Sequence, residues 1–216
     1  MWTASISSNM NFPAPIAAAA FLAGCGGLFL AIMGVLIAVF VKRTRWVLLI
    51  GGVVGLGVLV YFGLLLAFAL ASHEKVLARG EEKYFCEIDC HLAYSVQAVN
   101  ISPSGADLSH YVITLKTRFD VATISPHRPK DIPLKPNPRI ILLADSQGHL
   151  YMPNDSTGTD LTTPLRPGES YTTDIDFLVS KQATELHMLV ESSGWTERLL
   201  IGDESSPMHK KTWFGL

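Results

Sequence analysis

The sequence has few charged residues for its length, and the shortage is concentrated in the first third of the chain. Charged residues make up 17% of the 216 positions and apolar residues 49%, whereas about a quarter of the residues of a soluble domain are charged. Two stretches, 16–41 and 46–72, contain no charged residue at all. From His73 onward the composition is that of a soluble domain. The chain therefore divides into two parts of different class.

Other absences exclude classes of function. The formal net charge is −2 and there is no block of basic residues, so we expect no nucleic-acid partner. No phosphate-binding loop, Ser-His-Asp order or paired-carboxylate motif stands out, and most of the histidines are scattered singly. We therefore predict a protein that is not an enzyme and needs no cofactor.

Each uncharged stretch is long enough to cross a bilayer, since about 20 apolar residues span a hydrocarbon core about 30 Å thick. We predict an integral membrane protein with a flexible N-terminus (1–14) and a hairpin of two transmembrane helices (15–72). The run Leu22-Ala23-Gly24-Cys25 resembles a lipoprotein cleavage box. No positive charge precedes it, which favours a spanning helix over a signal peptide.

The short link between the two stretches carries the cations Lys42, Arg43 and Arg45. Basic loops favour the cytoplasmic side, and the N-terminal flank has no Lys or Arg. We therefore place this link in the cytoplasm and the C-terminal domain on the periplasmic or extracellular side of the cell's inner (cytoplasmic) membrane.

Small residues recur at four-residue spacing in both stretches, which lets helix backbones approach closely in lipid. They are Ala19, Ala23, Gly27 and Ala31 in the first stretch, and Gly51 and Gly55 in the second. Either these residues pack the two helices against each other, or one set faces another subunit. Both interpretations stay open.

After a linker (73–82), residues 83–216 have the pattern of a β-domain. Apolar and polar residues alternate over 111–119 and 171–179, and apolar runs occupy 139–144, 186–190 and 196–201. Turn sequences lie at 145–148 and 166–169, and prolines crowd the segment 126–138. Many short strands with spaced turns predict an all-β sandwich of about seven strands.

Three segments of this domain carry a family resemblance. Ile140–Tyr151 contains D-x-x-G-x-x-Y, Leu165–Ser170 contains L-x-P-G-E, and Ile175–Val179 has an apolar-Asp-Phe pattern. In this order they resemble the bacterial extracellular immunoglobulin-like domain family of unknown function, whose fold is similar to that of immunoprotective antigens. The resemblance implies an immunoglobulin-like sandwich outside the cytoplasm, and it implies no catalytic residues.

Two thiols and an imidazole lie together at Cys86, Cys90 and His91. A disulfide suits an exported domain, but on an extended strand the two Cα atoms would be about 13 Å apart. A disulfide needs less than about 7 Å, so it requires a turn between the cysteines. Alternatively, reduced cysteines face a core as small apolar residues.

A third interpretation is a copper or zinc site formed by Cys86, Cys90 and His91, because thiolate and imidazole suit these metals. Two helices followed by a β-domain also resemble subunit II of cytochrome c oxidase, whose dicopper loop reads C-x3-C-x3-H. Here Tyr94 stands where that motif has its histidine.

These patterns together predict a non-catalytic, membrane-anchored β-sandwich. Its expected partners are the lipid bilayer and other membrane or envelope proteins, and it would serve as an accessory subunit of a membrane complex or as a cell-envelope module. The alternative is a metal-binding or redox module that uses the cysteine–histidine segment.

Overall fold

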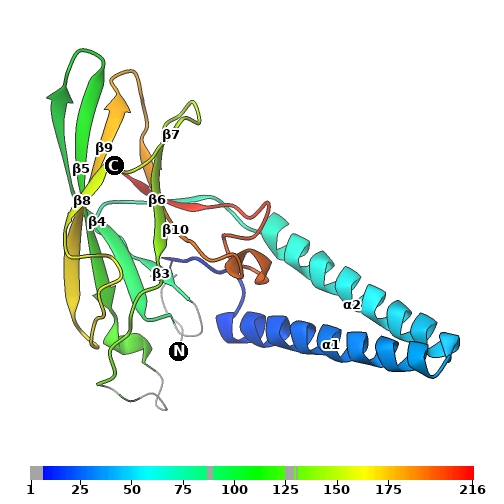
Figure 1. Cartoon of the computed structure of the whole chain (residues 1–216). Helices are drawn as coiled ribbons and strands as arrows, with labels where there is room; N and C mark the ends of the chain where they lie inside the picture. Colours follow the sequence, from blue (N-terminus) through cyan, green and yellow to red (C-terminus); the bar gives the residue numbers. More distant parts are fainter. Residues whose placement is uncertain (1–6, 87–89, 125–128, 130) are drawn as a thin grey trace.

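A computed structural model describes residues 7–86, 90–124, 129 and 131–216. Two long helices form a hairpin that projects from a sandwich of two β-sheets (Figure 1). Helix α1 spans Ala14–Phe40 and helix α2 spans Thr44–Leu70. The predicted class, two apolar helices followed by a β-sandwich, is confirmed.

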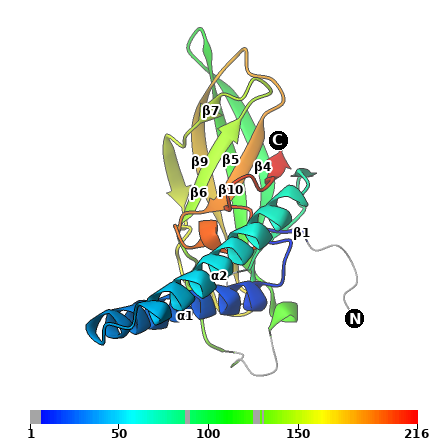
Figure 2. The same ribbon diagram turned by 90° about the vertical axis from the view of Figure 1, so that its right-hand side faces the viewer.

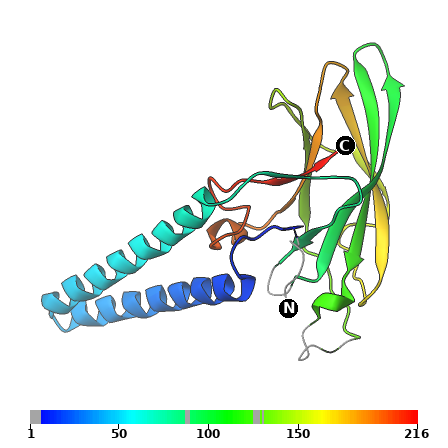
Figure 3. The ribbon, with the colours of Figure 1, turned by 180° about the vertical axis from the view of Figure 1, so that it is seen from behind.

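The hairpin is apolar on almost its whole surface. Each helix has 27 residues, which corresponds to about 40 Å at 1.5 Å per residue. The helices approach closely near their connecting turn, where a Cβ atom added to Gly34 would lie 3.2 Å from Ile50 Cδ1. Toward the sandwich they separate (Figures 1 and 3). The buried helical residues are Ala14, Ala17 and Ala38 of α1, and Leu65 and Ala69 of α2.

The two sheets face each other and are mainly antiparallel. The first has the order β1 (Ser7–Ser8), β3 (Lys83–Phe85), β4 (Leu92–Ser104), β5 (Leu108–Phe119), β9 (Ser170–Ser180) and β8 (Asp155–Gly158). The second has the order β2 (Lys75–Leu77), β11 (Thr212–Gly215), β10 (His187–Ser192), β6 (Arg139–Ala144) and β7 (Leu150–Tyr151). The pairs β1–β3 and β2–β11 are parallel. Short 3-10 helices occur at η1 (Val121–Thr123) and η2 (Glu197–Leu199).

The core lies between the sheets and follows from the alternation in the sequence. Successive side chains of a strand point to opposite faces of a sheet, so every second residue of β5 and β9 is turned inward. Ile113, Leu115, Ile175 and Phe177 are all at most 1% exposed. From the second sheet, Leu143, Met188, Val190 and Phe214 complete the same cluster with no exposed surface.

The D-x-x-G-x-x-Y motif forms the turn between β6 and β7. The carboxylate of Asp145 accepts hydrogen bonds from the backbone N–H groups of Gln147 and His149 and from the hydroxyl of Tyr151, each at 2.9–3.0 Å. Gly148 has a φ of 82°, a conformation that only glycine adopts without steric cost. These contacts give the family-like motif a structural role.

Several boundaries differ from the sequence-based prediction. Residues 73–82 are not a simple linker, because Lys75–Leu77 forms β2. Within 1–14, the described residues 7–13 contact the sandwich, and β1 joins its first sheet. The run 196–201 is not a strand but contains η2, and the last strand is β11. Part of the proline-rich segment lies outside the described residues; Leu134 forms a β-bridge with Leu165.

Candidate functional site at the base of the helical hairpin

Cys86 and Cys90 form a disulfide. Their Cα atoms are 4.0 Å apart, far less than the spacing of about 13 Å that an extended strand would give. The two cysteines therefore meet the distance condition that the sequence set for a disulfide; residues 87–89 lie outside the described residues. The backbone N–H of Cys86 donates a hydrogen bond to Asn9 Oδ1 at 2.8 Å, which connects the disulfide to the N-terminal segment.

His91 is buried beside the disulfide, at 1% exposure. Its Nδ1 lies 2.7 Å from Thr123 Oγ1, and its ring stacks on Phe119 with 5.3 Å between centroids. Because Thr123 Oγ1 donates its own proton to the carbonyl of Asp120, Nδ1 is the donor toward Thr123. Among the residues that the structure describes, no three His, Cys, Asp or Glu side chains gather as a metal site would require. Because Cys86 and Cys90 are bonded to each other, a metal site at this segment would require that the disulfide be reduced first.

The segment before α1, residues 7–13, holds the hairpin and the sandwich together, and we call it the N-terminal clasp. Asn9 Nδ2 donates to Asp203 Oδ2 at 3.1 Å. Asn11 Nδ2 donates to the carbonyl of Phe68 near the end of α2 at 2.8 Å, and the ring of Phe12 packs edge-on against that of Phe68. The beginning of α1 and the end of α2 are thus fixed to the same side of the sandwich (Figure 2).

A buried ion pair ties the two sheets to the segment that follows β10. Lys83 of β3 has no exposed surface and pairs with Glu204. Its ammonium group also donates to the carbonyls of Val190 and Thr212, at 2.7 and 3.1 Å. Burial lowers the pKa of Lys83, and the carboxylate of Glu204 opposes that shift. A lysine of the first sheet therefore reaches two strands of the second sheet through the interior.

Asp203, the neighbour of Glu204, lies against the clasp and is 1% exposed. Burial raises the pKa of its carboxyl group to about 7, although the backbone N–H of Ser205 donates to it and acts in the opposite direction. The carboxyl group therefore changes charge near neutral pH, at the point where the clasp meets the sandwich.

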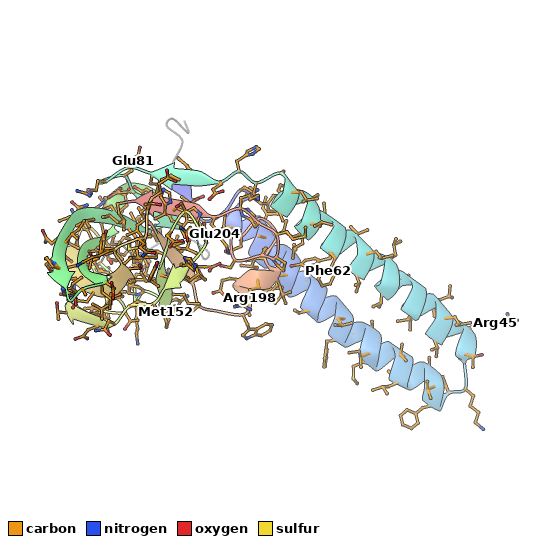
Figure 4. The ribbon with its side chains drawn as sticks, turned by 90° about the horizontal axis from the view of Figure 1, so that it is seen from above. Arg45, Phe62, Glu81, Met152, Arg198 and Glu204 are labelled. Atoms are coloured by element: carbon orange, nitrogen blue, oxygen red, sulfur yellow. A yellow bond between two sulfur atoms is a disulfide. The ribbon has the colours of Figure 1, made fainter. Side chains whose placement is uncertain are left out.

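The segment 193–206, which contains η2, lies against the hairpin, and we call it the wedge segment. Figures 1 and 3 show it, in orange-brown, beside the sandwich-side ends of α1 and α2. Tyr61 of α2 donates its hydroxyl proton to the carbonyl of Leu199 at 2.7 Å. In the view from above, Arg198 of this segment lies beside the hairpin near Phe62 (Figure 4).

A groove of about 640 Å³ runs between the two helices and ends at Leu199 of the wedge segment. Three of the small residues identified in the sequence line it, Ala23, Gly27 and Ala31, together with bulky residues of α2 such as Trp46 and Val53. A Cβ atom added at Gly27, Gly51 or Gly55 would have no neighbour within 4 Å. These glycines therefore do not pack the two helices against each other, which corrects that interpretation. The close contact is instead at Gly34.

Ala19 and the pair Gly51 and Gly55 are exposed and do not line this groove. The cations Lys42, Arg43 and Arg45 are exposed at the far end of the hairpin, away from the sandwich. The residues at the junction, Asn9, Lys83, Asp203 and Glu204, were not singled out from the sequence. No local pattern in the sequence marks them, because Asn9 pairs with Asp203 and Lys83 with Glu204 across more than 100 positions.

The fold and its junction define a two-sheet β-sandwich carried on two long apolar helices. No family model matches the chain, and the search of curated proteins found no match. Two solved structures are similar to it. An uncharacterised β-sandwich protein of Clostridium difficile 630 has 10% identity and a TM-score of 0.40, over 67% of this chain and 95% of that one. A conserved hypothetical protein of Bacillus anthracis has 12% identity and a TM-score of 0.34, over 46% of this chain and 82% of that one.

Proposed function

We propose that this protein is a membrane-anchored, non-catalytic β-sandwich that binds another membrane protein through its helical hairpin, as an accessory subunit of a membrane complex. The observation that carries the proposal is an apolar hairpin that is almost entirely uncovered and has both of its ends fixed to the sandwich. The sandwich lies on the periplasmic or extracellular side of the membrane.

The exposure of the helices supports two membrane spans. Both helices are long and apolar enough to cross a bilayer, with mean hydropathies of 2.4 and 2.6. Only 6% and 11% of the residues in their most apolar 18-residue segments are buried, whereas the core helix of a soluble protein would be mostly covered. Exposed apolar surface of this extent is not stable in water.

The N-terminal clasp argues against α1 being a removable signal sequence. Removal of α1 would also remove β1 and Asn9, which bind to β3 and Asp203. The clasp and the sandwich must therefore lie on the same side of the membrane, and two spans satisfy that condition. The basic connecting turn favours the cytoplasm, and the disulfide is consistent with an oxidising compartment for the sandwich.

The groove supports a partner that contributes an apolar helix. Ala23, Gly27 and Ala31 line it at a spacing of four residues, and such a row of small residues lets a second backbone approach closely. Because α2 does not fill this row, it remains available to another chain. The sandwich then carries the disulfide and the buried ion pair as structural supports.

Substitution at the groove tests the proposal. Gly27→Leu fills the groove, and Gly26→Leu is the matched control, because Gly26 is the neighbouring residue and does not line the groove. Neither added side chain meets anything within the protein at its Cβ atom, so both variants should fold alike. The measurement is co-purification in mild detergent, with the partner identified by mass.

We expect wild type and Gly26→Leu to retain one stoichiometric membrane partner and Gly27→Leu to lose it. A wild-type protein that purifies as a lone monomer, or a partner that all three proteins retain equally, would contradict binding through this groove.

A further inference from the structure

The wedge segment separates a partly covered part of the hairpin from a part that is almost entirely uncovered. On the sandwich side of it lie four of the five buried helical residues, Ala14, Ala17, Leu65 and Ala69. On the other side, only Ala38 near the connecting turn is buried. Leu199 lies at the boundary between these parts. Its carbonyl accepts the hydrogen bond from Tyr61, and it lines the same groove as Phe21.

The uncovered part has the length of a bilayer core. From Phe21 to Phe40 along α1 is about 20 residues, or about 30 Å, and from Thr44 to Tyr61 along α2 is about 18 residues, or about 27 Å, at 1.5 Å per residue. The hydrocarbon core of a bilayer is about 30 Å thick. Both helices therefore reach the far boundary of the core at the level of the wedge segment, if the basic turn lies at the near one.

Close in sequence to this boundary, the wedge segment exposes a tryptophan. Trp195, four positions before Leu199, is 70% exposed to solvent, although it belongs to a folded domain. Arg198 and Glu197 are nearby in the same segment. Tryptophan and charged residues with long side chains are favoured where the hydrocarbon meets the headgroups.

We propose that the wedge segment is a lipid-binding surface, in which Trp195 inserts into the outer boundary of the bilayer and fixes the depth and orientation of the sandwich. This inference rests on the proposed membrane span of the hairpin. The partner of this surface is the interface of the lipid bilayer itself. The remaining length, about 10 Å of α1 and about 13 Å of α2, then lies above the hydrocarbon, where the wedge segment and the clasp contact the helices on one side.

Three tryptophans of the chain serve as depth probes, because they lie in different parts of the molecule. Full-length single-tryptophan proteins keep Trp46 near the basic turn, Trp195 in the wedge segment, or Trp213 in β11, with the other tryptophans replaced by Phe. Each is reconstituted into phosphatidylcholine nanodiscs with bromine atoms either near the headgroup or near the bilayer centre. Fluorescence quenching by bromine is then compared with that in unbrominated discs.

We expect Trp46 and Trp195 to be quenched at least twofold more by shallow bromine than by deep bromine, because both lie at a boundary of the core. Trp213 should be unaffected, since it belongs to the sandwich. Quenching of Trp46 without quenching of Trp195 would overturn the inference and leave the membrane span intact. An unquenched Trp46 would overturn both. If a single-tryptophan protein fails to fold, wild type and the single variant Trp195→Phe are compared instead. The variant should then lose part of the quenching by shallow bromine that wild type shows.

Discussion

Gly202 allows the N-terminal clasp to pass directly over the segment that follows η2. Its φ is 79°, and an added Cβ atom would lie 2.5 Å from Phe12 Cβ and 2.9 Å from Phe12 N. Gly80 has a similar φ of 82° but nothing within 4 Å of an added Cβ. Alanine substitution at the two positions therefore distinguishes the free-energy cost of the positive φ, which both share, from the cost of a steric clash, which only Gly202 would have.

We predict that Gly202→Ala destabilises the protein more than Gly80→Ala does. The positive φ costs about 1–2 kcal/mol in either variant, and the contact with Phe12 must add to it at Gly202 alone. Urea unfolding in detergent measures the difference, and hydrogen exchange locates it. The amide of Asn11, which donates to the carbonyl of Gly202 at 2.9 Å, should exchange faster only in Gly202→Ala. Equal destabilisation by the two variants would show that the clasp is not held at this position.

Asp203 makes the stability of the junction depend on pH. Its folded-state pKa of about 7 lies above the ordinary value of 3.8 because the carboxyl group is buried. Between these two values the folded state binds more protons than the unfolded state, so stability falls as pH rises through this range. The slope from one such group is at most about 1.4 kcal/mol per pH unit.

We predict that wild type loses more stability than Asp203→Asn when the pH rises from 5 to 7.5. The variant carries no titrating group at this position, and the other groups of the protein contribute to both measurements. Urea midpoints at the two pH values supply the comparison. Parallel pH dependence in the two proteins would count against the raised pKa.

The residues of the junction could not be found from the sequence because their partners are remote in the chain. Lys83 follows an apolar stretch and looks like a membrane-flanking cation, but its carboxylate partner is Glu204 and its carbonyl partners belong to β10 and β11. Cys86 and Cys90 are different, since their spacing alone allowed a disulfide on the condition of a turn. The sequence could state that condition but could not decide whether it was met.

At the scale of elements, strands with clear alternation or a compact apolar run were predictable, whereas β4, the longest strand with 13 residues, and the shortest strands were not. β5 and β9 have 12 and 11 residues and alternate over most of their length, which is enough to establish a period of two. β1, β2 and β11 have 2, 3 and 4 residues, so no period can be read from them. They become strands because remote segments offer them backbone partners, as β11 does for β2. The hairpin was predictable because its signal, length without charge, is local.

The disulfide contributes stability by closing a short loop in the unfolded chain, which lowers the entropy of the unfolded state. Its cysteines are four positions apart, and closing a loop of about five residues reduces the entropy of the unfolded chain by the equivalent of about 2 kcal/mol. We predict that the double variant Cys86→Ser/Cys90→Ser is less stable than wild type by about this amount. Cys25→Ser is the control, because Cys25 is a free, exposed residue of α1.

Intact mass before and after reduction and alkylation checks the pairing. Cys86 and Cys90 should resist alkylation until the protein is reduced. If they react without reduction, and the same sample contains stoichiometric copper or zinc, the segment is a metal site and the structural role of the disulfide is wrong.

At the scale of the whole molecule, the clasp determines which parts of the chain lie on the same side of the membrane. The segment before α1 and the sandwich after α2 are bonded to each other, so a spanning hairpin has both of its outer ends on one side and its basic turn on the other. A helix pair lying flat on a membrane, or buried in a partner in solution, would satisfy the same contacts without separating the two. Only the location of the turn relative to the bilayer distinguishes these arrangements.

We predict that the turn and the sandwich differ in their access to a membrane-impermeant maleimide. In a Cys25→Ser background, Thr44→Cys places a thiol at the exposed turn and Gln147→Cys places one at the exposed β6–β7 turn of the sandwich. In closed spheroplasts Gln147→Cys should react, and Thr44→Cys should react only after the membrane is opened with detergent, because the cations of the turn favour the cytoplasm. The reverse pattern would mean an inverted hairpin, and labelling of both thiols in closed spheroplasts would mean that the helices do not cross the membrane. Since the clasp fixes both ends of the hairpin to the sandwich, two labelling sites are sufficient to decide among the three cases.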